Sequence, residues 1–537
     1  MNKSKNITIP ICLILLIQVM LCCSSCSKRE KHQIDLHYLN NLADTVYTGQ
    51  ERMVFLTNGV GGWYFDDAFK SKTRGTFGYN RKEEKVLSNW ELLDLEGNSL
   101  LDDPLFCVTF PTHIERHYSN EIIERIEMPL GNSGISFEFI LPKRQGVIFR
   151  PYFDFRHLEY EESVDYITLL DDNSGTLCAA KEDMSGGWVA VSSSAPFEWR
   201  ETIKIQRQNY SLSELTGRPG SAIPWSPGEV STKPGRKVQF AVGWGKDKVT
   251  AINTSNTIVS SVLIWRENRV SRIKDVLDDV VFSCDNRDLV KAFDWARIVA
   301  NQFVYEENER INIFTGFPYT PFPTGWGTFL SISEMLKCGI SSNDITEIIE
   351  STIEGQKQDK YSPKYGMLPS SIKDGENEYL VSEIAGLMVR ALMKLKNQDV
   401  PDRFRITETM ISATKANLIG TAIYRVKNGM VVSDSLEHFL ADSPGAPLRG
   451  GAAIENQVLY SICREFFKDR NIIPDTSDFL KDIPGSLLKG VGLEAFNSDA
   501  PFIVVGETSK YSLVLRKKLV LSPFTDNSST WFGDYVP

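Results

Sequence analysis

The run Gly134-Ile-Ser-Phe-Glu-Phe-Ile-Leu141 indicates the fold of the first half of the chain. Its aromatic and β-branched residues favour a β-strand. Gly146–Phe153 and Lys237–Gly243 have the same character. Short runs of this kind, broken by Gly, Asn, Asp, Ser and Pro, continue from about Val46 to Ile264. Strands at this spacing predict an antiparallel β-sandwich, to which we assign residues 46–270.

Near Ser271 the spacing of apolar residues changes to that of helices, so residues 271–537 are expected to form a helical domain. The expected helices are Asp288–Tyr305, Thr328–Cys338, Asn343–Gln356, Tyr379–Lys396, Arg403–Val426 and Gly450–Phe467. Long connections lie between them, at Asn312–Gly327, Gln358–Glu378 and Lys427–Gly450. Loops of this length in a folded domain often carry function, so we expect functional residues there.

The N-terminus has the features of an export signal. A basic start at Lys3 and Lys5 precedes an apolar stretch that is short for a membrane span. The stretch ends near Cys26, and the small residues before that cysteine resemble the lipobox of bacterial lipoproteins. Cys23 is the alternative lipidation site. The resemblance implies a signal peptide over 1–25, a lipidated tether over 26–45, and an outer-membrane lipoprotein that faces the periplasm or the cell surface.

The composition excludes some classes of partner and cofactor. Acidic and basic residues are interspersed, the net charge is −10, and there is no basic stripe, so nucleic acid is not an expected partner. Beyond the signal, the five cysteines are scattered and show no paired spacing. We expect them to be small buried residues, and we expect no metal or other cofactor. Aromatic residues make up 11% of the chain, which suits carbohydrate-contacting clefts and large β-rich cores alike.

The segment Leu448–Ile462 contains the strongest candidate for a catalytic residue. After a glycine turn it has helical periodicity, and apolar Val458 and Leu459 follow Glu455 by three and four positions. Glu455 therefore lies on the apolar face near the start of the helix. A carboxylate there is paired, hydrogen-bonded or directed into a cleft, because burying it alone is costly. Arg449 could orient it as a general base, or the pair could be purely structural.

Several stretches resemble, in the same order, motifs of bacterial glycogen debranching enzymes of the amylo-α-1,6-glucosidase type. In the first half these are Phe55-Leu-Thr-Asn-Gly-Val-Gly-Gly-Trp63, Thr73-Arg74 and Phe149–His157. In the second half they are Trp326–Phe329, Gly366–Pro369 with Val381–Ile384, and Arg449–Glu455. Together they cover roughly Val46 to Phe467. The resemblance implies a β-sandwich followed by an (α/α) toroid of six helical hairpins.

The same resemblance implies hydrolysis of α-1,6-linked glucosyl branches in an α-glucan, with inversion, and Glu455 as the base. It also implies substrate-binding roles for Trp326, Trp63, Asp442 and Arg449. Each of these has a structural alternative. The tryptophans could fill the core, and Asp442 could cap a turn before Ser-Pro.

One departure from the family concerns the general acid. The family carries an Arg-Asp pair within the motif that Trp326–Phe329 resembles, and this chain has glycine or threonine there. An inverting enzyme needs both an acid and a base. Glu383 is a candidate substitute, although it also suits the start of a helix. Glu376 and Glu378 are further candidates. The alternative is an inactive glucan-binding protein.

A second departure concerns length. The helical half ends soon after Leu521–Phe524, which resembles a point before the family's last hairpins. About a third of the toroid would then be missing unless another chain completes it, and the sequence does not indicate the oligomeric state. An open toroid would expose apolar helix faces.

Overall fold

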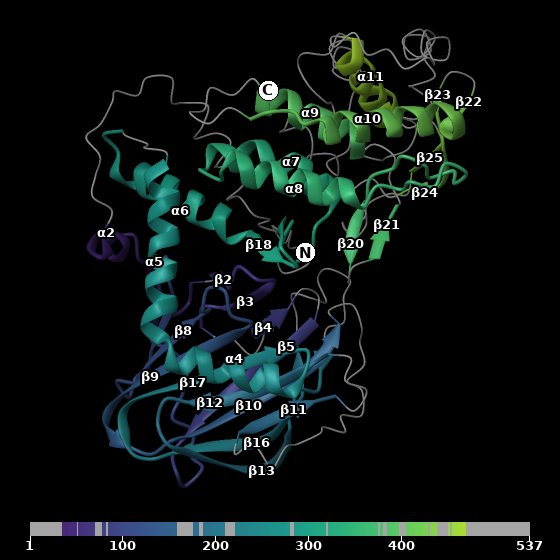
Figure 1. The fold of residues 1–537 in the computed structure, drawn as a ribbon. Helices are drawn as coiled ribbons and strands as arrows, with labels where there is room; N and C mark the ends of the chain where they lie inside the picture. The colour runs from purple at the N-terminus through teal and green to yellow at the C-terminus, as the bar shows by residue number, and fades with distance from the viewer. Residues whose placement is uncertain are drawn as a thin grey trace, which may run out of the picture. The chain divides into compact units, whose positions relative to one another are not determined.

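The computed structural model describes residues 35–50, 52–69, 78–81, 84–157, 176–181, 186–209, 221–279, 284–317, 320–373, 376–379, 384–396, 404–427, 430–437, 449–451 and 454–468 (Figure 1). The chain divides into two compact units. The first comprises Met1–Tyr305 with Lys337–Ile340, and the second comprises Glu306–Leu336 with Ser341–Pro537.

In its described part, the first unit contains two large antiparallel sheets. One has the strand order β1 (Asp44–Tyr47), β6 (Phe106–Thr109), β7 (Ile114–His117), β8 (Ile123–Glu127), β9 (Gly134–Gln145), β17 (Gly235–Gly245), β12 (Trp188–Ser193) and β11 (Leu177–Ala180). The other has the order β13 (Phe197–Ile205), β16 (Trp225–Thr232), β10 (Ile148–His157), β5 (Glu84–Leu93), β4 (Gly78–Arg81), β3 (Gly62–Asp67) and β2 (Met53–Thr57). β14 (Gln208–Asn209) pairs with β15 (Ser221–Ala222). The predicted antiparallel β-sandwich is confirmed.

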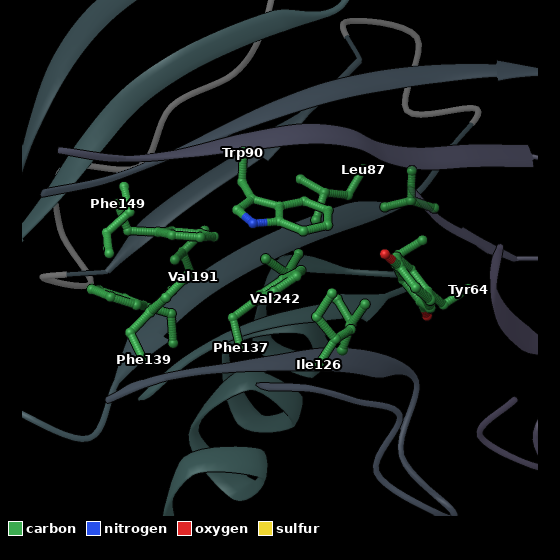
Figure 2. Close-up of a cluster of buried hydrophobic side chains, with 14 of the residues drawn as sticks. Tyr64, Leu87, Trp90, Ile126, Phe137, Phe139, Phe149, Val191 and Val242 are labelled. Atoms are coloured by element: carbon green, nitrogen blue, oxygen red, sulfur yellow. The ribbon is translucent and has the colours of Figure 1, made fainter. Parts of the chain in front are cut away.

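Aromatic side chains from both sheets fill the core between them (Figure 2). Trp90 of β5 packs on Phe137 of β9, with ring centroids 4.3 Å apart. Phe149 of β10 stacks on Phe240 of β17 at 4.7 Å. All four side chains are buried, and burial of such large rings is a major source of stability. The three runs that predicted strands therefore supply the facing sides of one core.

Helix α4 (Lys248–Ser260) packs on β17 and β12 of the first sheet. A β-carbon on Gly243 would lie 2.3 Å from the Ser255 nitrogen, and one on Gly245 would lie 2.4 Å from the Ala251 nitrogen. The helix backbone therefore rests directly on the strand. Ser192 Oγ of β12 adds a 2.8 Å hydrogen bond to Ser255 Oγ.

The prediction that the β pattern continues to Ile264 is wrong, because the last strand of the sandwich ends at Gly245. α4 and α5 (Val262–Asp279) occupy the following segment. The Thr, Val, Ile, Ser and Asn residues of α4 are poor helix formers and show no apolar stripe. Close packing on glycine stabilises this helix, together with the Asp247 side chain, which accepts a 2.8 Å hydrogen bond from the Thr250 nitrogen at its start.

The glycine-rich turn between β2 and β3 is confirmed as a strand-ending turn. Gly59 and Gly61 have φ values of +73° and +86°, which favour glycine. Asn58 Oδ1 accepts hydrogen bonds from the nitrogens of Val60 and Gly62. The turn follows Thr57, whose hydroxyl donates to the Gln302 carbonyl at 2.8 Å. This motif thus fixes the sandwich to the end of α6 (Arg287–Gln302).

The segment 26–45, predicted as a tether, ends in ordered structure. α2 (Leu36–Asn41) buries Leu39 in a cluster that includes Ile273 and Ile298, and Leu42 joins the same cluster. Trp295 Nε1 donates to the Leu42 carbonyl at 2.7 Å. The apolar residues of this short stretch are too few to predict a helix from the sequence. Cys26 and the signal segment lie outside the described residues.

The second unit consists mainly of helices and short hairpins. Its elements are β18 (Val304–Glu307, which begins in the first unit), β19 (Arg310–Ile313), α7 (Gly325–Lys337), α8 (Ser342–Glu354), β20 (Ser371–Lys373), β21 (Glu376–Glu378), α9 (Ile384–Lys396), α10 (Glu408–Gly420), the π-helix η1 (Thr421–Arg425), β22 (Val426–Lys427), β23 (Met430–Val431), β24 (Ser433–Glu437), β25 (Arg449–Gly451) and α11 (Ile454–Lys468). With α6, these helices confirm the predicted ones, although α9 and α10 each start five residues later than predicted and the segment after Gly420 is the π-helix η1.

Cys107, Cys178, Cys338 and Cys463 are buried and Cys284 is partly exposed, so four of the five match the expected role. Among the described residues, no helix is both long and apolar enough to cross a membrane.

We expect Gly243→Val to destabilise the protein by about 3 kcal/mol, because the new side chain would overlap the backbone of α4. Thermal or urea unfolding would measure the loss. The matched control is Gly235→Ala in the same strand, where the nearest atom to a β-carbon is 3.3 Å away, and it should change stability by less than about 0.5 kcal/mol. Equal effects of the two variants would contradict this account of the α4 contact.

Candidate functional site

Two long loops of the helical unit are joined at the start of α7. The Gly325 nitrogen donates to the Ser370 carbonyl at 2.9 Å, and the Ile372 nitrogen donates to the Pro323 carbonyl at 3.0 Å. Thr324 and Ser371 form an isolated antiparallel β-bridge between these two hydrogen bonds. The loop before α7 therefore continues the sheet of the β20–β21 hairpin.

The first turns of α7 and α9 also meet. A β-carbon on Gly325 would lie 2.6 Å from Ile384 Cγ2, so the first residues of the two helices touch. Further along, Glu334 of α7 faces Arg390 of α9, whose pKa is lowered by burial and raised in part by Glu334. Contacts that advance in the same direction along both helices show that α7 and α9 are parallel. Their N-terminal ends therefore lie together.

α11 packs on α9 at a second glycine contact. A β-carbon on Gly386 would lie 2.5 Å from Leu459 Cβ and 2.8 Å from the Leu459 carbonyl oxygen. α8 and α10 form a separate parallel pair, in which Thr407 Oγ1 donates to Glu350 and Gln356 Nε2 donates to the Ala413 carbonyl. The described helices thus alternate between a set of α7, α9 and α11 and a set of α8 and α10.

The third long loop reaches α11 through its β-hairpins. Val431 of β23 exchanges two hydrogen bonds with the Gln457 amide, at 2.9 Å and 2.6 Å. In the next hairpin, Glu437 of β24 lies opposite Arg449 of β25 in the antiparallel strand pairing. α11 begins three residues after β25 ends at Gly451. Long loops therefore contact the first turns of α7 and of α11.

Trp326 is in the first turn of α7, beside this loop junction. Its ring is partly exposed, and its Nε1 atom is buried without a hydrogen-bond partner among the described residues. An indole N–H in such a place usually has a hydrogen-bond partner. This position keeps the stacking role predicted for Trp326 open, and it does not match a fully buried plug.

The two residues after Trp326 offer no place for the missing acid. A β-carbon on Gly327 would lie 2.6 Å from both Thr315 Cβ and Thr324 Oγ1. Thr328 is fully buried, and its hydroxyl has no hydrogen-bond partner within the described part of the chain. Neither position can hold a carboxyl group without rearrangement. The packing around Gly327 and Thr328 therefore excludes the aspartate that the family motif has at this point.

Glu455 is the second residue of α11, close to its N-terminal end as predicted. The apolar face predicted for this helix is buried, with Val458 2% and Leu459 1% exposed. Asn456 and Gln457 are buried too, so the helix is enclosed on more than its apolar face. The backbones of Glu455 and Arg449 are described, but their side chains lie outside the description. Their predicted roles remain predictions.

The remaining carboxylates among the predicted site residues lie either outside the described residues or on the β20–β21 hairpin. Glu383 and Asp442 lie outside the described residues, so their roles remain predictions. Glu376 and Glu378 are exposed on β21, and the Ser371 hydroxyl donates to the Glu378 carboxylate at 2.6 Å. The hairpin that carries them is fastened to the start of α7, which the sequence spacing alone does not reveal.

Trp63 requires a correction. It lies in β3 of the first unit and its side chain is 0% exposed. A ring with no accessible face cannot stack on a saccharide, so Trp63 has the alternative role of an aromatic core residue. All six residues of β3 are buried, so neither face of this strand is open to a ligand.

The charged and polar groups that the structure describes contain no cluster of three or more His, Cys, Asp or Glu residues able to hold a metal ion.

Within α11, burial raises the pKa of Tyr460, and its hydroxyl has no hydrogen-bond partner in the described structure. Arg425 and Arg464 act on Tyr460 in the opposite direction. This tyrosine was not predicted, since its position in the helix resembles that of any core aromatic residue.

Comparison with known proteins identifies no family. No protein-family model and no curated protein matches the chain. A bacterial glucoamylase solved with acarbose is 8% identical over 83% of this chain and 67% of its own, with a TM-score of 0.47. A family GH92 alpha-mannosidase from Bacteroides thetaiotaomicron is 11% identical over 82% and 62%, with a TM-score of 0.38. A family GH92 inverting mannosidase from Bacteroides thetaiotaomicron VPI-5482 is 10% identical over 82% and 61%, with a TM-score of 0.40.

These solved structures are all glycoside hydrolases. The chain spans about three fifths of the length of the two mannosidases, at 62% and 61%.

We expect Gly327→Asp to destabilise the protein by about 2 kcal/mol or more rather than to create an acid, because its side chain would overlap Thr315 and Thr324. Thr328→Val is the matched control at the next position. It replaces a buried hydroxyl that lacks a partner, so stability should change by less than about 1 kcal/mol. Thermal unfolding tests both, and an aspartate variant as stable as the wild type would refute the steric argument.

Proposed function

We propose that the protein is an exported, glycoside hydrolase-like protein that binds an α-glucan and hydrolyses its α-1,6-glucosyl branches with inversion. The observation that carries the proposal is the junction at the start of α7, where Trp326 has a partly exposed ring and a buried indole N–H without a partner. The exposed part of the aromatic face suits stacking against the apolar face of a sugar ring. The colinear sequence motifs that resemble those of debranching enzymes suggest the substrate class.

In this proposal Glu455 is the base that activates water. Its place at the N-terminal end of α11 favours the ionised carboxylate that a base requires. Arg449 would orient it, and Asp442 and Trp326 would bind the sugar. The acid must come from outside Gly327 and Thr328, and Glu383, directly before α9, is our candidate because the starts of α9 and α7 touch. The two carboxyl groups of an inverting enzyme lie about 6.5–9.5 Å apart.

The alternative is an inactive glucan-binding protein that retains the saccharide site. The enclosed Gly327 and Thr328 favour it, because the acid is excluded from the position that the motif indicates. Such a protein would bind saccharide through Trp326 and release no product. The two functions therefore differ in turnover and agree in binding.

The full chain should release β-glucose from a branched limit dextrin, as observed by NMR of the fresh product. Glu455→Gln should lower the rate by about 100-fold or more, the effect of losing a general base. Glu408→Gln, the same change at an exposed position in α10, is the control and should retain the wild-type rate. Full activity of the Glu455 variant would exclude this mechanism. Saccharide binding without any product would support the inactive alternative.

We also propose that Cys26 carries a lipid and anchors the protein to the outer membrane. The supporting observation is the run of small residues before Cys26 after an apolar export signal. Labelling of expressing cells with a radioactive fatty acid should mark the wild type and Cys23→Ala, and should fail to mark Cys26→Ala. Label that persists in Cys26→Ala and disappears in Cys23→Ala would move the anchor to Cys23.

A further inference from the structure

Residues 35–43, which comprise α2 and the residues on either side of it, lie against α6 and are called the strap. Lys291 Nζ of α6 donates to the Ala43 carbonyl of the strap at 2.7 Å. Trp295 Nε1 of α6 donates to the Leu42 carbonyl, also at 2.7 Å. Positions four apart lie on one face of a helix, so a single face of α6 holds the strap.

Asp294 lies on the same face of α6 and makes a third polar contact with the strap. Its carboxylate accepts a hydrogen bond from the Tyr38 hydroxyl of α2, which is the one hydrogen bond that it receives within the described part of the chain. Arg297 Nη1 is 3.8 Å from the other carboxylate oxygen. The Arg297 guanidinium donates instead to the carbonyls of Leu277 and Cys338, at 3.1 Å and 3.4 Å. A single neutral donor therefore serves this carboxylate.

The carboxyl group of Asp294 is buried between the strap and α6. The residue is 7% exposed, and Tyr38, which contacts it, packs on the apolar cluster that contains Leu39, Leu42 and Ile298. Burial raises the pKa of Asp294, and the Tyr38 hydroxyl and the nearby arginine lower it only in part. The docked strap therefore favours the protonated carboxyl group over the ionised one.

The direction of the pH dependence follows from the groups around Asp294. Among the described residues, those that act on its charge are Tyr38 of α2 and Arg297 of α6, whereas α5 contributes apolar residues such as Ile273 to the adjoining cluster. When the strap leaves, water reaches Asp294 and its pKa returns toward the ordinary carboxyl value. A pKa that is higher in the docked state means that docking takes up a proton. Docking therefore strengthens as the pH falls through the docked-state pKa, and this gain is absent above it.

We propose that Tyr38 and Asp294 form a pH-sensitive latch, which holds the strap more tightly on α6 as the solution becomes acidic. When ionised, the carboxylate is buried with one hydrogen bond, and this cost weakens docking. A proton removes the charge and keeps the hydrogen bond, because a protonated carboxyl group and a phenol can each donate or accept. The bonds from Lys291 and Trp295 go to backbone carbonyls, so they hold the strap at either pH.

Hydrogen exchange of the full chain, followed by mass spectrometry, tests the latch. A helix as short as α2 is not stable alone, so protection of its amides reports docking. After correction for intrinsic exchange rates, protection of residues 36–43 should be about three-fold or more higher at about pH 5 than at about pH 8. Asp294→Asn should lose this pH dependence, because asparagine is uncharged and still accepts the hydrogen bond. Asp275→Asn, the same change at an exposed position in α5, should retain it.

Tyr38→Phe keeps the ring and removes the hydroxyl. It should lower protection about ten-fold at about pH 8 and by a smaller factor at about pH 5, because an ionised carboxylate suffers most from losing its donor. An equal loss at both pH values would overturn the inference, since Tyr38 would then act without regard to the charge. Wild-type pH dependence in Asp294→Asn would also overturn it, because any effect of the histidines is common to the wild type and the variants. So would equal protection of the wild type at the two pH values.

Discussion

The two sheets of the first unit are held together by hydrogen bonds from the Arg269 guanidinium, and the rest of the unit depends on this contact. Arg269 is buried, and it donates to the carbonyls of Thr57, at the end of β2, and Met128, after β8. β2 and β8 belong to different sheets, so one side chain of α5 fixes both. Burial, with Arg272 nearby, lowers the pKa of Arg269 to about 10, which shows how strongly the site disfavours the charge. Backbone carbonyls offset that cost only while both sheets stay in place.

The sequence predicted elements wherever one local pattern agreed with the final packing. The run Gly134–Leu141 became β9, and the helical period after Gly450 became α11. α4 was missed because its stability comes from backbone contact with Gly243 and Gly245 of the preceding strand, which composition does not reveal. Tertiary contacts overrode the intrinsic preference of its β-branched residues. α2 was missed for a related reason, since its buried Leu39, and Leu42 directly after the helix, gain their partners from α5 and α6.

The candidate site likewise has features that the local sequence predicts and features that depend on tertiary contacts. The position of Glu455 at the start of a helix followed from periodicity, whereas Trp326, expected in the loop before Thr328, is in the first turn of α7. The enclosure of Gly327 and the burial of Trp63 did not follow from periodicity, because both depend on which chains pass close by. The π-helix η1 at Thr421–Arg425 lies within the segment that the sequence predicted as one continuous helix. Periodicity therefore located the start of α11, whereas close packing between segments determines which candidate side chains are accessible.

The docking of α2 makes residues that precede the first strand part of the core of the first unit. Leu39 and Leu42 are buried beside Ile273 of α5 and Ile298 of α6, and the Trp295 indole donates to the Leu42 carbonyl. Lys291 Nζ adds a hydrogen bond to the Ala43 carbonyl at 2.7 Å. Removal of this short segment would expose apolar surface of α5 and α6 to water, so the segment and the two helices should unfold as one cooperative unit.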